Sequence, residues 1–244
     1  MTDGGPPLLQ VSGLELSYGA LKVLHGVSLH VAAGEVVALI GRNGTGKSTT
    51  LGAIFGLAPV ERGDVVFDGV TITNRTAAEN VRHGLALAPQ ASNEGRGIFH
   101  GLSVQENLEL GALHAGQRGT VEASKERVFQ LFPVLRGAGR LAMAGLLSGG
   151  QQQMLAVGIA LMSQPRLLLL DEPTSGLSPA VANLLMQTIG GIAREHGIAV
   201  LIVEQNIRLA LEIARRVYVM RTGRVVREDT GAGLLASENL LAVL

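Results

Sequence analysis

The stretch GRNGTGKS at residues 41–48 limits the possible fold of this chain more than any other segment. It matches the pattern G-x-x-x-x-G-K-[ST]. The continuous apolar run Val36–Ile40 precedes it, which is typical of a strand covered on both faces. A segment with helical composition, about 47–57, follows it. The sequence therefore predicts a strand, a glycine-rich loop that curls around phosphate groups, and a helix.

Each residue type in this loop has a physical role in binding phosphate. Glycines let backbone N–H groups approach an anion, and the start of the next helix adds a partial positive charge. Lys47 is placed to reach the β- and γ-phosphates of a nucleotide, and the Ser48 hydroxyl to bind Mg²⁺. An ordinary glycine-rich turn is the alternative interpretation. The predicted phosphate-binding residues are Gly41, Arg42, Asn43, Gly44, Thr45, Gly46, Lys47, Ser48 and Thr49.

A second apolar run, residues 167–170, ends in two adjacent carboxylates, Asp171 and Glu172. Ligands of open α/β sheets bind at the carboxyl ends of the strands. We expect Asp171 to hold Mg²⁺, through water, and Glu172 to polarise the water that attacks a phosphate. The alternative is that the two acids simply begin a solvent-exposed loop.

The order of apolar patterns predicts an α/β fold with a mainly parallel sheet, because strands alternate with helices along the chain. Residues 8–17 and 24–31 alternate in polarity and predict an N-terminal antiparallel β-subdomain. Ser103 and Glu106 form a capping-box pattern at the start of a helix. Further expected elements are a strand at 65–70, with Asp68-Gly69 as a turn signal, and helices at 104–113, 122–135 and 150–162. We expect one domain over 8–236 with a helical subdomain inserted at roughly 91–163, and short tails at 1–7 and 237–244.

The composition limits the kinds of molecule that this chain is expected to bind. The formal net charge of +0 gives no general attraction to nucleic acid or anionic lipid, so neither is expected as a direct partner. The chain has no cysteine, which excludes disulfides and thiolate metal sites. No apolar run approaches the roughly 20 residues that span a bilayer. We therefore expect any membrane association to depend on a partner protein and not on direct lipid insertion.

Residues 147–151 read LSGGQ and provide a second helix N-terminus suited to anions. Together with the phosphate loop and the acid pair, this motif makes the chain resemble the ATP-binding cassette (ABC) ATPases, over nearly its whole length. The resemblance implies a P-loop nucleotide hydrolase fold. It also implies a head-to-tail dimer with a copy of itself or a paired paralogue. The residues implied to bind the ATP of the opposite subunit are Ser148, Gly149, Gly150 and Gln151.

The same resemblance assigns three further positions. Tyr18 matches the aromatic residue that stacks on adenine, although a half-buried strand tyrosine would look the same. Gln90 matches the glutamine that contacts Mg²⁺ and links to a transmembrane partner. Phe99, in the segment 97–108, is a candidate anchor for the permease, or else a core residue. The implied partners are permease subunits and, indirectly, a solute-binding protein, which places the chain on the cytoplasmic side of the cell membrane.

The segment LIVEQN, residues 201–206, predicts a buried strand, which the resemblance places next to or close to the strand that carries the acid pair. Most ABC ATPases have a histidine where this chain has Gln205, and a glutamine can donate hydrogen bonds but cannot carry a positive charge. We expect its amide to orient water or the γ-phosphate. VEQN and GRGIF, residues 95–99, resemble the importers of branched-chain amino acids and their urea and short-chain amide relatives. Residues 91–94 look like an insertion relative to them.

Three alternatives to an amino-acid importer remain. The transported solute could be urea or a short-chain amide, a distinction to which Arg42 adds only a slight preference. A soluble ABC ATPase, such as an iron–sulfur assembly scaffold, tends to have charged residues after LSGG, whereas this chain has three glutamines. An ATPase for lipid or polysaccharide export generally keeps the histidine that Gln205 replaces.

Overall fold

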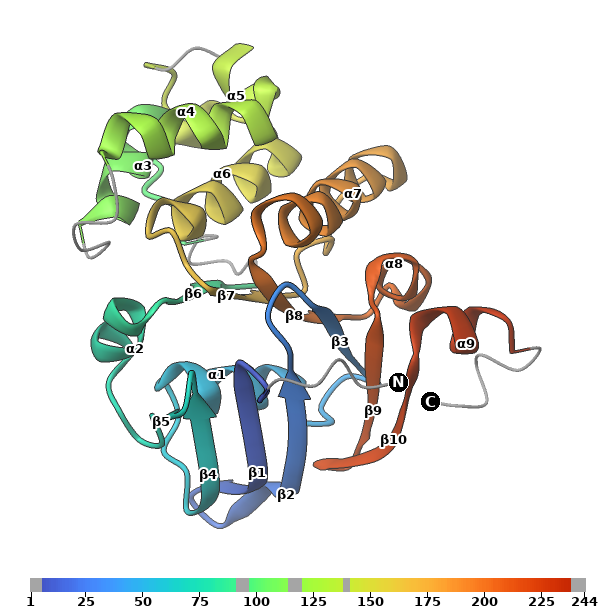
Figure 1. Cartoon of the computed structure of the whole chain (residues 1–244). Helices are drawn as coiled ribbons and strands as arrows, with labels where there is room; N and C mark the ends of the chain where they lie inside the picture. Colours follow the sequence, from blue (N-terminus) through green and yellow to red (C-terminus); the bar gives the residue numbers. More distant parts are fainter. Residues whose placement is uncertain (1–5, 91–96, 114–119, 138–140, 238–244) are drawn as a thin grey trace.

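A computed structural model of the chain describes residues 6–90, 97–113, 120–137 and 141–237 (Figure 1). Its centre is a six-stranded sheet in which every neighbouring pair is parallel except the hairpin between β9 and β10. The mainly parallel sheet is thus confirmed, and β8 lies next to β7 as predicted. In spatial order the strands are β10 (Arg224–Thr230), β9 (Arg216–Arg221), β3 (Val36–Ile40), β8 (Ala199–Glu204), β7 (Leu167–Asp171) and β6 (Leu85–Ala88).

The unbroken apolar runs are explained by two hydrophobic cores, one on each face of this sheet. Successive side chains of a strand point to opposite faces. In β7, Leu168 and Leu170 belong to the core under the helices, whereas Leu167 and Leu169 belong to the core under the antiparallel sheet. β3 and β6 are therefore apolar throughout, as are β7 up to Leu170 and β8 up to Val203, and their first polar residues occur where they end.

The second sheet is antiparallel and lies on the face of the central sheet that also carries α1 (Lys47–Phe55) (Figure 1). The predicted single strand over 65–70 is wrong in extent. The chain turns at Asp68 and Gly69, both with positive φ, and two strands result. The order of strands is β2 (Leu21–Val31), β1 (Leu9–Tyr18), β4 (Arg62–Phe67) and β5 (Val70–Thr71).

Most of the remaining helices cover the other face of the central sheet or pack together beyond it, whereas α2 (Ala77–His83) lies beside β6 at the edge of that sheet (Figure 1). The capping box of Ser103 and Glu106 is confirmed. The single helix predicted over 122–135 is wrong, because Pro133 lacks an N–H and begins a new helix. The helices are α2 (Ala77–His83), α3 (Val104–Ala112), α4 (Val121–Leu131), α5 (Pro133–Gly137), the 3₁₀ turn Ala144–Leu146, α6 (Gly149–Met162), α7 (Pro179–His196), α8 (Ile207–Ile213) and α9 (Gly231–Leu235).

The short elements α2 and β6 were not expected, since neither is long enough to show a clear period. None of the helices within the described ranges combines the length and the hydropathy that crossing a membrane requires. The domain limits and the inserted subdomain over 91–163 stay predictions, and residues 91–96 of that segment lie outside the described residues.

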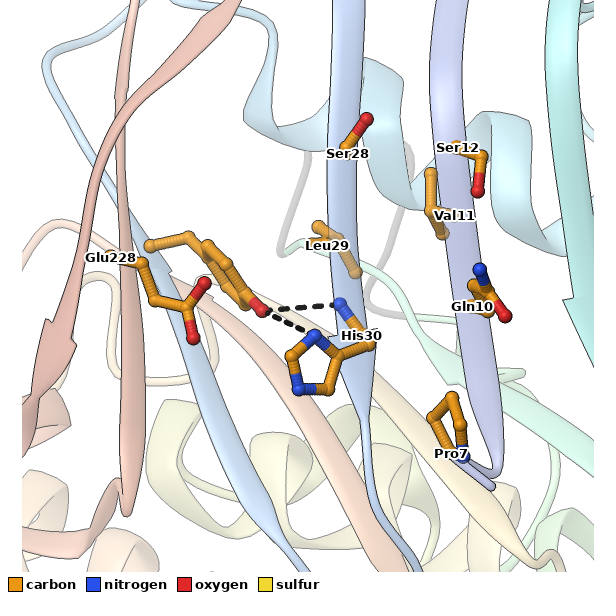
Figure 2. Close-up of a pocket in the computed structure, with 9 residues that line it drawn as sticks. Pro7, Gln10, Val11, Ser12, Ser28, Leu29, His30 and Glu228 are labelled. Carbon is orange, nitrogen blue, oxygen red and sulfur yellow. Dashed lines mark hydrogen bonds between the residues drawn. The ribbon is translucent and has the colours of Figure 1, made fainter. Parts of the chain in front are cut away.

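One contact ties the antiparallel sheet to the edge of the central sheet. Tyr218 of β9 is buried, and its hydroxyl accepts a hydrogen bond from the backbone N–H of His30 at 3.2 Å. The same hydroxyl lies 3.0 Å from His30 Nδ1 (Figure 2). Burial raises the pKa of Tyr218 to about 12. A groove of about 460 Å³ lies beside this contact and is bordered by β1, β2, β9 and β10.

Candidate active site

The phosphate loop joins β3 to α1 and has a backbone that only glycine tolerates at its last turn. Gly46 has φ of 99°, and a Cβ there would lie 2.8 Å from Leu24 Cδ2. Lys47 begins α1 and folds back, so that its Nζ donates to the carbonyls of Gly41 at 2.9 Å and Arg42 at 3.0 Å. Burial lowers the pKa of Lys47, and nearby carboxylates oppose this effect. The lysine is thus held at the centre of the loop.

The acid pair lies at the carboxyl end of β7, directly opposite this loop. Asp171 Oδ1 accepts a hydrogen bond from Ser48 Oγ at 2.9 Å. Burial raises the pKa of Asp171, and the bond from Ser48 opposes that shift. Glu172 has the left-handed φ of 47°, and its N–H donates to Val203 at 2.8 Å. Left-handed backbone is uncommon for a residue other than glycine and is often found at functional positions.

Two glutamines bind the Glu172 side chain from different strands. Gln90 follows β6 and donates from Nε2 to Glu172 Oε2 at 2.7 Å. Gln205 follows β8 and donates from Nε2 to both Glu172 oxygens at 2.6 Å. The structure therefore brings the predicted hydrolysis residues together in one pocket of about 290 Å³, lined by Asn43, Gly44, Gly46, Lys47, Ser48, Thr49, Gln90, Glu172 and Gln205.

The donor set of this pocket fits Mg²⁺. Ser48 and Asp171 present a hydroxyl and a carboxylate in direct contact, and Gln90 lines the same pocket as Ser48. Magnesium prefers oxygen ligands of this kind and is commonly held by one or two carboxylates plus phosphate. Three carboxylates, those of Asp171, Glu172 and Glu204, act electrostatically on Lys47. The resulting excess of negative charge favours a divalent cation.

The remaining predicted residues lie apart from this pocket. Tyr18 ends β1 with 54% of its surface exposed, as a residue that stacks on a base would be. Ser148 caps α6 and forms a capping box with Gln151, and neither lines the pocket. Phe99 is also exposed, which excludes the core-packing alternative for it. The insertion at 91–94 lies outside the described residues.

Glu204 is a site residue to which the sequence interpretation gave no role. It is 1% exposed, and its Oε1 accepts from the N–H of Thr174 at 2.8 Å. Its Oε2 accepts from the N–H groups of Gln205 at 3.0 Å and Asn206 at 3.1 Å. Glu204 thus joins the loop after β7 to the turn after β8. The available signal was an acid at the end of an apolar strand, the same signal that identified Asp171.

Comparison with known proteins agrees with this geometry. Residues 24–175 match the family model described as ABC transporter. A high-affinity branched-chain amino acid transport ATP-binding protein, BraG of Pseudomonas aeruginosa, is 40% identical, with 94% of this chain and 96% of the relative covered. A probable branched-chain amino acid transport ATP-binding protein, LivF of Archaeoglobus fulgidus, is 36% identical, with 95% of each covered. The lipopolysaccharide export ATP-binding protein LptB of Haemophilus influenzae is 30% identical over 97% of this chain and 96% of the relative.

Solved structures give the same result for the fold. The crystal structure of a nucleotide-free ATP-binding cassette from an ABC transporter has a TM-score of 0.82 and 27% identity, with 98% of both chains covered. The α/β fold with its P-loop and parallel sheet is therefore confirmed. The chain belongs to the ABC transporter family and is an ATPase.

Proposed function

We propose that this ATPase drives an importer of branched-chain or other amino acids. The observation that carries the proposal is the single pocket in which the phosphate loop, Glu172 and Gln205 meet. Gln205 stands where most ABC ATPases have a histidine. This glutamine, paired with Glu172, is the feature that resembles the branched-chain importers. The similarity to BraG and LivF over nearly the whole chain supports the same choice.

The reaction we propose is ATP plus water to ADP plus phosphate. The loop N–H groups and Lys47 would bind the β- and γ-phosphates. Ser48, Asp171 and Gln90 would hold Mg²⁺, which neutralises charge on the phosphates. Glu172 would accept the proton of the attacking water. Tyr18 would stack on the adenine ring.

We propose that two ATPase subunits act together, head to tail. Residues 148–151 begin a helix and do not line the pocket of their own chain, which supports a role at the ATP of the other subunit. Helix N-termini of this kind bind phosphate well. The partner would be a second copy or a paired paralogue.

We further propose that permease subunits hold the ATPase on the cytoplasmic side of the cell membrane and receive solute from a binding protein. Phe99 is exposed beside the start of α3, as an anchor for such a partner would be. A separate, largely apolar pocket of about 310 Å³ between α1, α2, α3 and α6 could accept a permease segment. Its residues include Phe55, Val81 and Leu110.

The alternatives differ in the partner and the solute. Urea or a short-chain amide is the second candidate for the transported solute, and only the sequence resemblance supports it. A soluble assembly scaffold would copurify with no membrane protein. The similarity to LptB would also allow an exporter. Exporters of that kind, however, generally carry a histidine where this chain has Gln205.

Reconstitution tests the proposal. The chain would be combined in proteoliposomes with the permease and the solute-binding protein encoded beside it, and ATP-dependent uptake of labelled leucine, isoleucine, valine and urea would be measured. Uptake of the branched-chain amino acids, lost with Lys47→Ala, is the expected result. ATP hydrolysis without association with any permease would contradict the importer role.

A further inference from the structure

The turn between β9 and β10, formed by Thr222 and Gly223, lies against the phosphate loop. The Gly223 N–H donates a hydrogen bond to the Thr45 carbonyl at 3.0 Å. The Gly223 carbonyl accepts one from the N–H of His25, in β2, at 2.9 Å. Gly223 is buried, although its neighbours Thr222 and Arg224 are exposed. One backbone residue therefore joins the phosphate loop to the antiparallel sheet.

The parallel register of β3 and β9 explains why this turn meets the loop. Ile40, the last residue of β3, pairs with Val219, so the chain continues from Gly41 beside Met220. The approach is close, because a Cβ at Gly41 would lie 2.3 Å from the Met220 carbonyl oxygen. β9 ends one residue later, and the turn then lies beside the second half of the loop.

A second attachment holds the turn on β2. Arg224, the first residue of β10, donates from its guanidinium to the His25 carbonyl at 2.8 Å. Gly223 itself has no room for a side chain, since a Cβ there would lie 2.1 Å from the Val23 carbonyl oxygen. Its φ of 71° follows a φ of 44° at Thr222, and a type I′ hairpin turn requires positive φ at both central residues. Any side chain at position 223 would therefore push the turn away from β2.

The hydrogen bond to Thr45 determines the direction of the next N–H group in the loop. All described peptide bonds are trans, and the C=O and N–H of a trans peptide point to opposite sides. The Thr45 carbonyl points to the turn, so the Gly46 N–H points away from it. Gly46 also lines the pocket that contains Lys47 and Ser48.

We propose that Gly223 is a positioning residue for ATP, which holds the Thr45–Gly46 peptide so that the Gly46 N–H points at the phosphates. The proposal rests on the proposed function, in which the N–H groups of this loop bind phosphate. If the peptide turned over, the Thr45 oxygen would face the phosphates and repel them, because both carry negative charge. Through the bond between Gly223 and His25, the affinity for ATP then depends on the position of β2.

Gly223→Ala tests this role, with Gly69→Ala as the matched control. Gly69 is also the second residue of a hairpin turn, between β4 and β5, and has φ of 73° after Asp68 with φ of 51°. A Cβ at Gly69 would meet no atom within 4 Å. Both variants place alanine on left-handed backbone, but only Gly223→Ala disturbs a contact of the phosphate loop.

Calorimetric titration with ATP and Mg²⁺ measures the effect. Gly223→Ala should bind roughly tenfold more weakly, the usual cost of one hydrogen bond to a charged group. Gly69→Ala should bind with the affinity of the wild-type chain. Equal affinities for the two variants would overturn the proposal.

The backbone amide resonance of Gly46 separates positioning from a general loss of stability. Without nucleotide, Gly223→Ala should shift this resonance, because the peptide that carries it has lost its hydrogen bond to the turn. Gly69→Ala should leave it unchanged. A Gly46 resonance that stays at its wild-type position in folded Gly223→Ala would also overturn the proposal.

If Gly223→Ala does not fold, a semisynthetic chain with an ester in place of the peptide bond between Thr222 and Gly223 replaces it. The ester removes the N–H that Thr45 accepts, adds no side chain and keeps the Gly223 carbonyl that His25 binds. It should weaken ATP binding by the same factor of roughly ten. Wild-type affinity in the ester chain would overturn the role of Gly223.

The wild-type chain separates this proposal from the proposed function. The backbone N–H resonances of residues 44–47 should shift when ATP and Mg²⁺ are added. If they do not shift, the phosphate-loop assignment fails, and the role of Gly223 fails with it. If they shift and the altered chains bind ATP as the wild type does, only the role of Gly223 is wrong.

Discussion

At the scale of single residues, the chemistry centres on Glu172, a buried carboxylate on left-handed backbone. Its oxygens receive the amides of Gln90 and Gln205, and its neighbour Asp171 receives the hydroxyl of Ser48. Adjacent acids on one strand end therefore have separate environments and separate partners. This separation supports the proposed roles, in which Glu172 acts on water and Asp171 holds a cation.

Glu172→Gln should lower ATP turnover about 100-fold or more, since general-base catalysis typically contributes at least that factor. ATP should still bind, and a stable ATP-bound dimer should form. Gln205→Ala should cost roughly tenfold, as is typical for a residue that acts through another. Phosphate release at saturating ATP measures both, and gel filtration detects the dimer. Equal losses for the two variants would mean that Gln205 takes part in the chemistry directly.

Lys47→Ala should weaken ATP binding by about 10- to 100-fold, the usual cost of a lost charged hydrogen bond. The lysine is already folded onto the loop carbonyls of Gly41 and Arg42, so it is preorganised for phosphate. Calorimetric titration measures the affinity, and an unchanged thermal unfolding curve would confirm that the fold is intact. An affinity equal to that of the wild-type chain would contradict the phosphate-loop assignment.

At the scale of an element, α6 combines a proposed binding role at its start with a packing role along its length. Ser148 caps it, and most of its later residues are buried. Gln153 is fully buried, and within the described ranges neither polar atom of its amide has a hydrogen-bond partner. A buried amide without partners costs about 1–3 kcal/mol.

Gln153→Met should therefore stabilise the chain by about 1 kcal/mol, because it keeps the side-chain volume and removes the unpaired amide. This corresponds to a rise of about 2–4 °C in Tm for a chain of this size. Gln152→Met is the control. Its Nε2 donates to the Ala144 carbonyl at 3.2 Å, so that variant should gain nothing. A lower Tm for Gln153→Met would show that the amide has a partner in solution.

At the scale of the whole molecule, the phosphate loop depends on two sheets that are held together. Gly46 packs against Leu24 of the antiparallel sheet and Met220 of the central sheet. The hydroxyl of Tyr218 and the backbone of His30 connect the same two sheets at another point (Figure 2). Loosening this connection should affect stability before it affects ATP chemistry.

Stability should fall as pH rises from about 10 to 12. The pKa of Tyr218 is about 12 in the fold and near 10 in the unfolded chain, so the unfolded state loses this proton first. The contribution is fully present below pH 10 and amounts to about 2–3 kcal/mol. Tyr218→Phe should flatten this part of the profile of unfolding free energy against pH. A wild-type profile with the same slope as the variant would contradict the assignment.

Much of the fold was predictable because its signals are local. The glycines and Lys47 of the phosphate loop, the cap at Ser103 and the apolar run of β3 each act within a few residues, so their effects can be read in order along the chain. The helix split at Pro133 was missed although a proline is itself a local signal, whereas α2 and β6 are too short to show a clear period.

The sequence by itself determined the order of the longer strands and helices, the phosphate loop, and which strand ends carry polar residues. Only the tertiary structure decided which of those residues touch. Gln90 and Glu172 are 82 positions apart, Gln205 and Glu172 are 33 apart, and His30 and Tyr218 are 188 apart. The physical reason is that parallel strands bring their carboxyl ends to one edge, but the register of β6, β7 and β8 fixes each side-chain contact. The role of Glu204 depends wholly on that register.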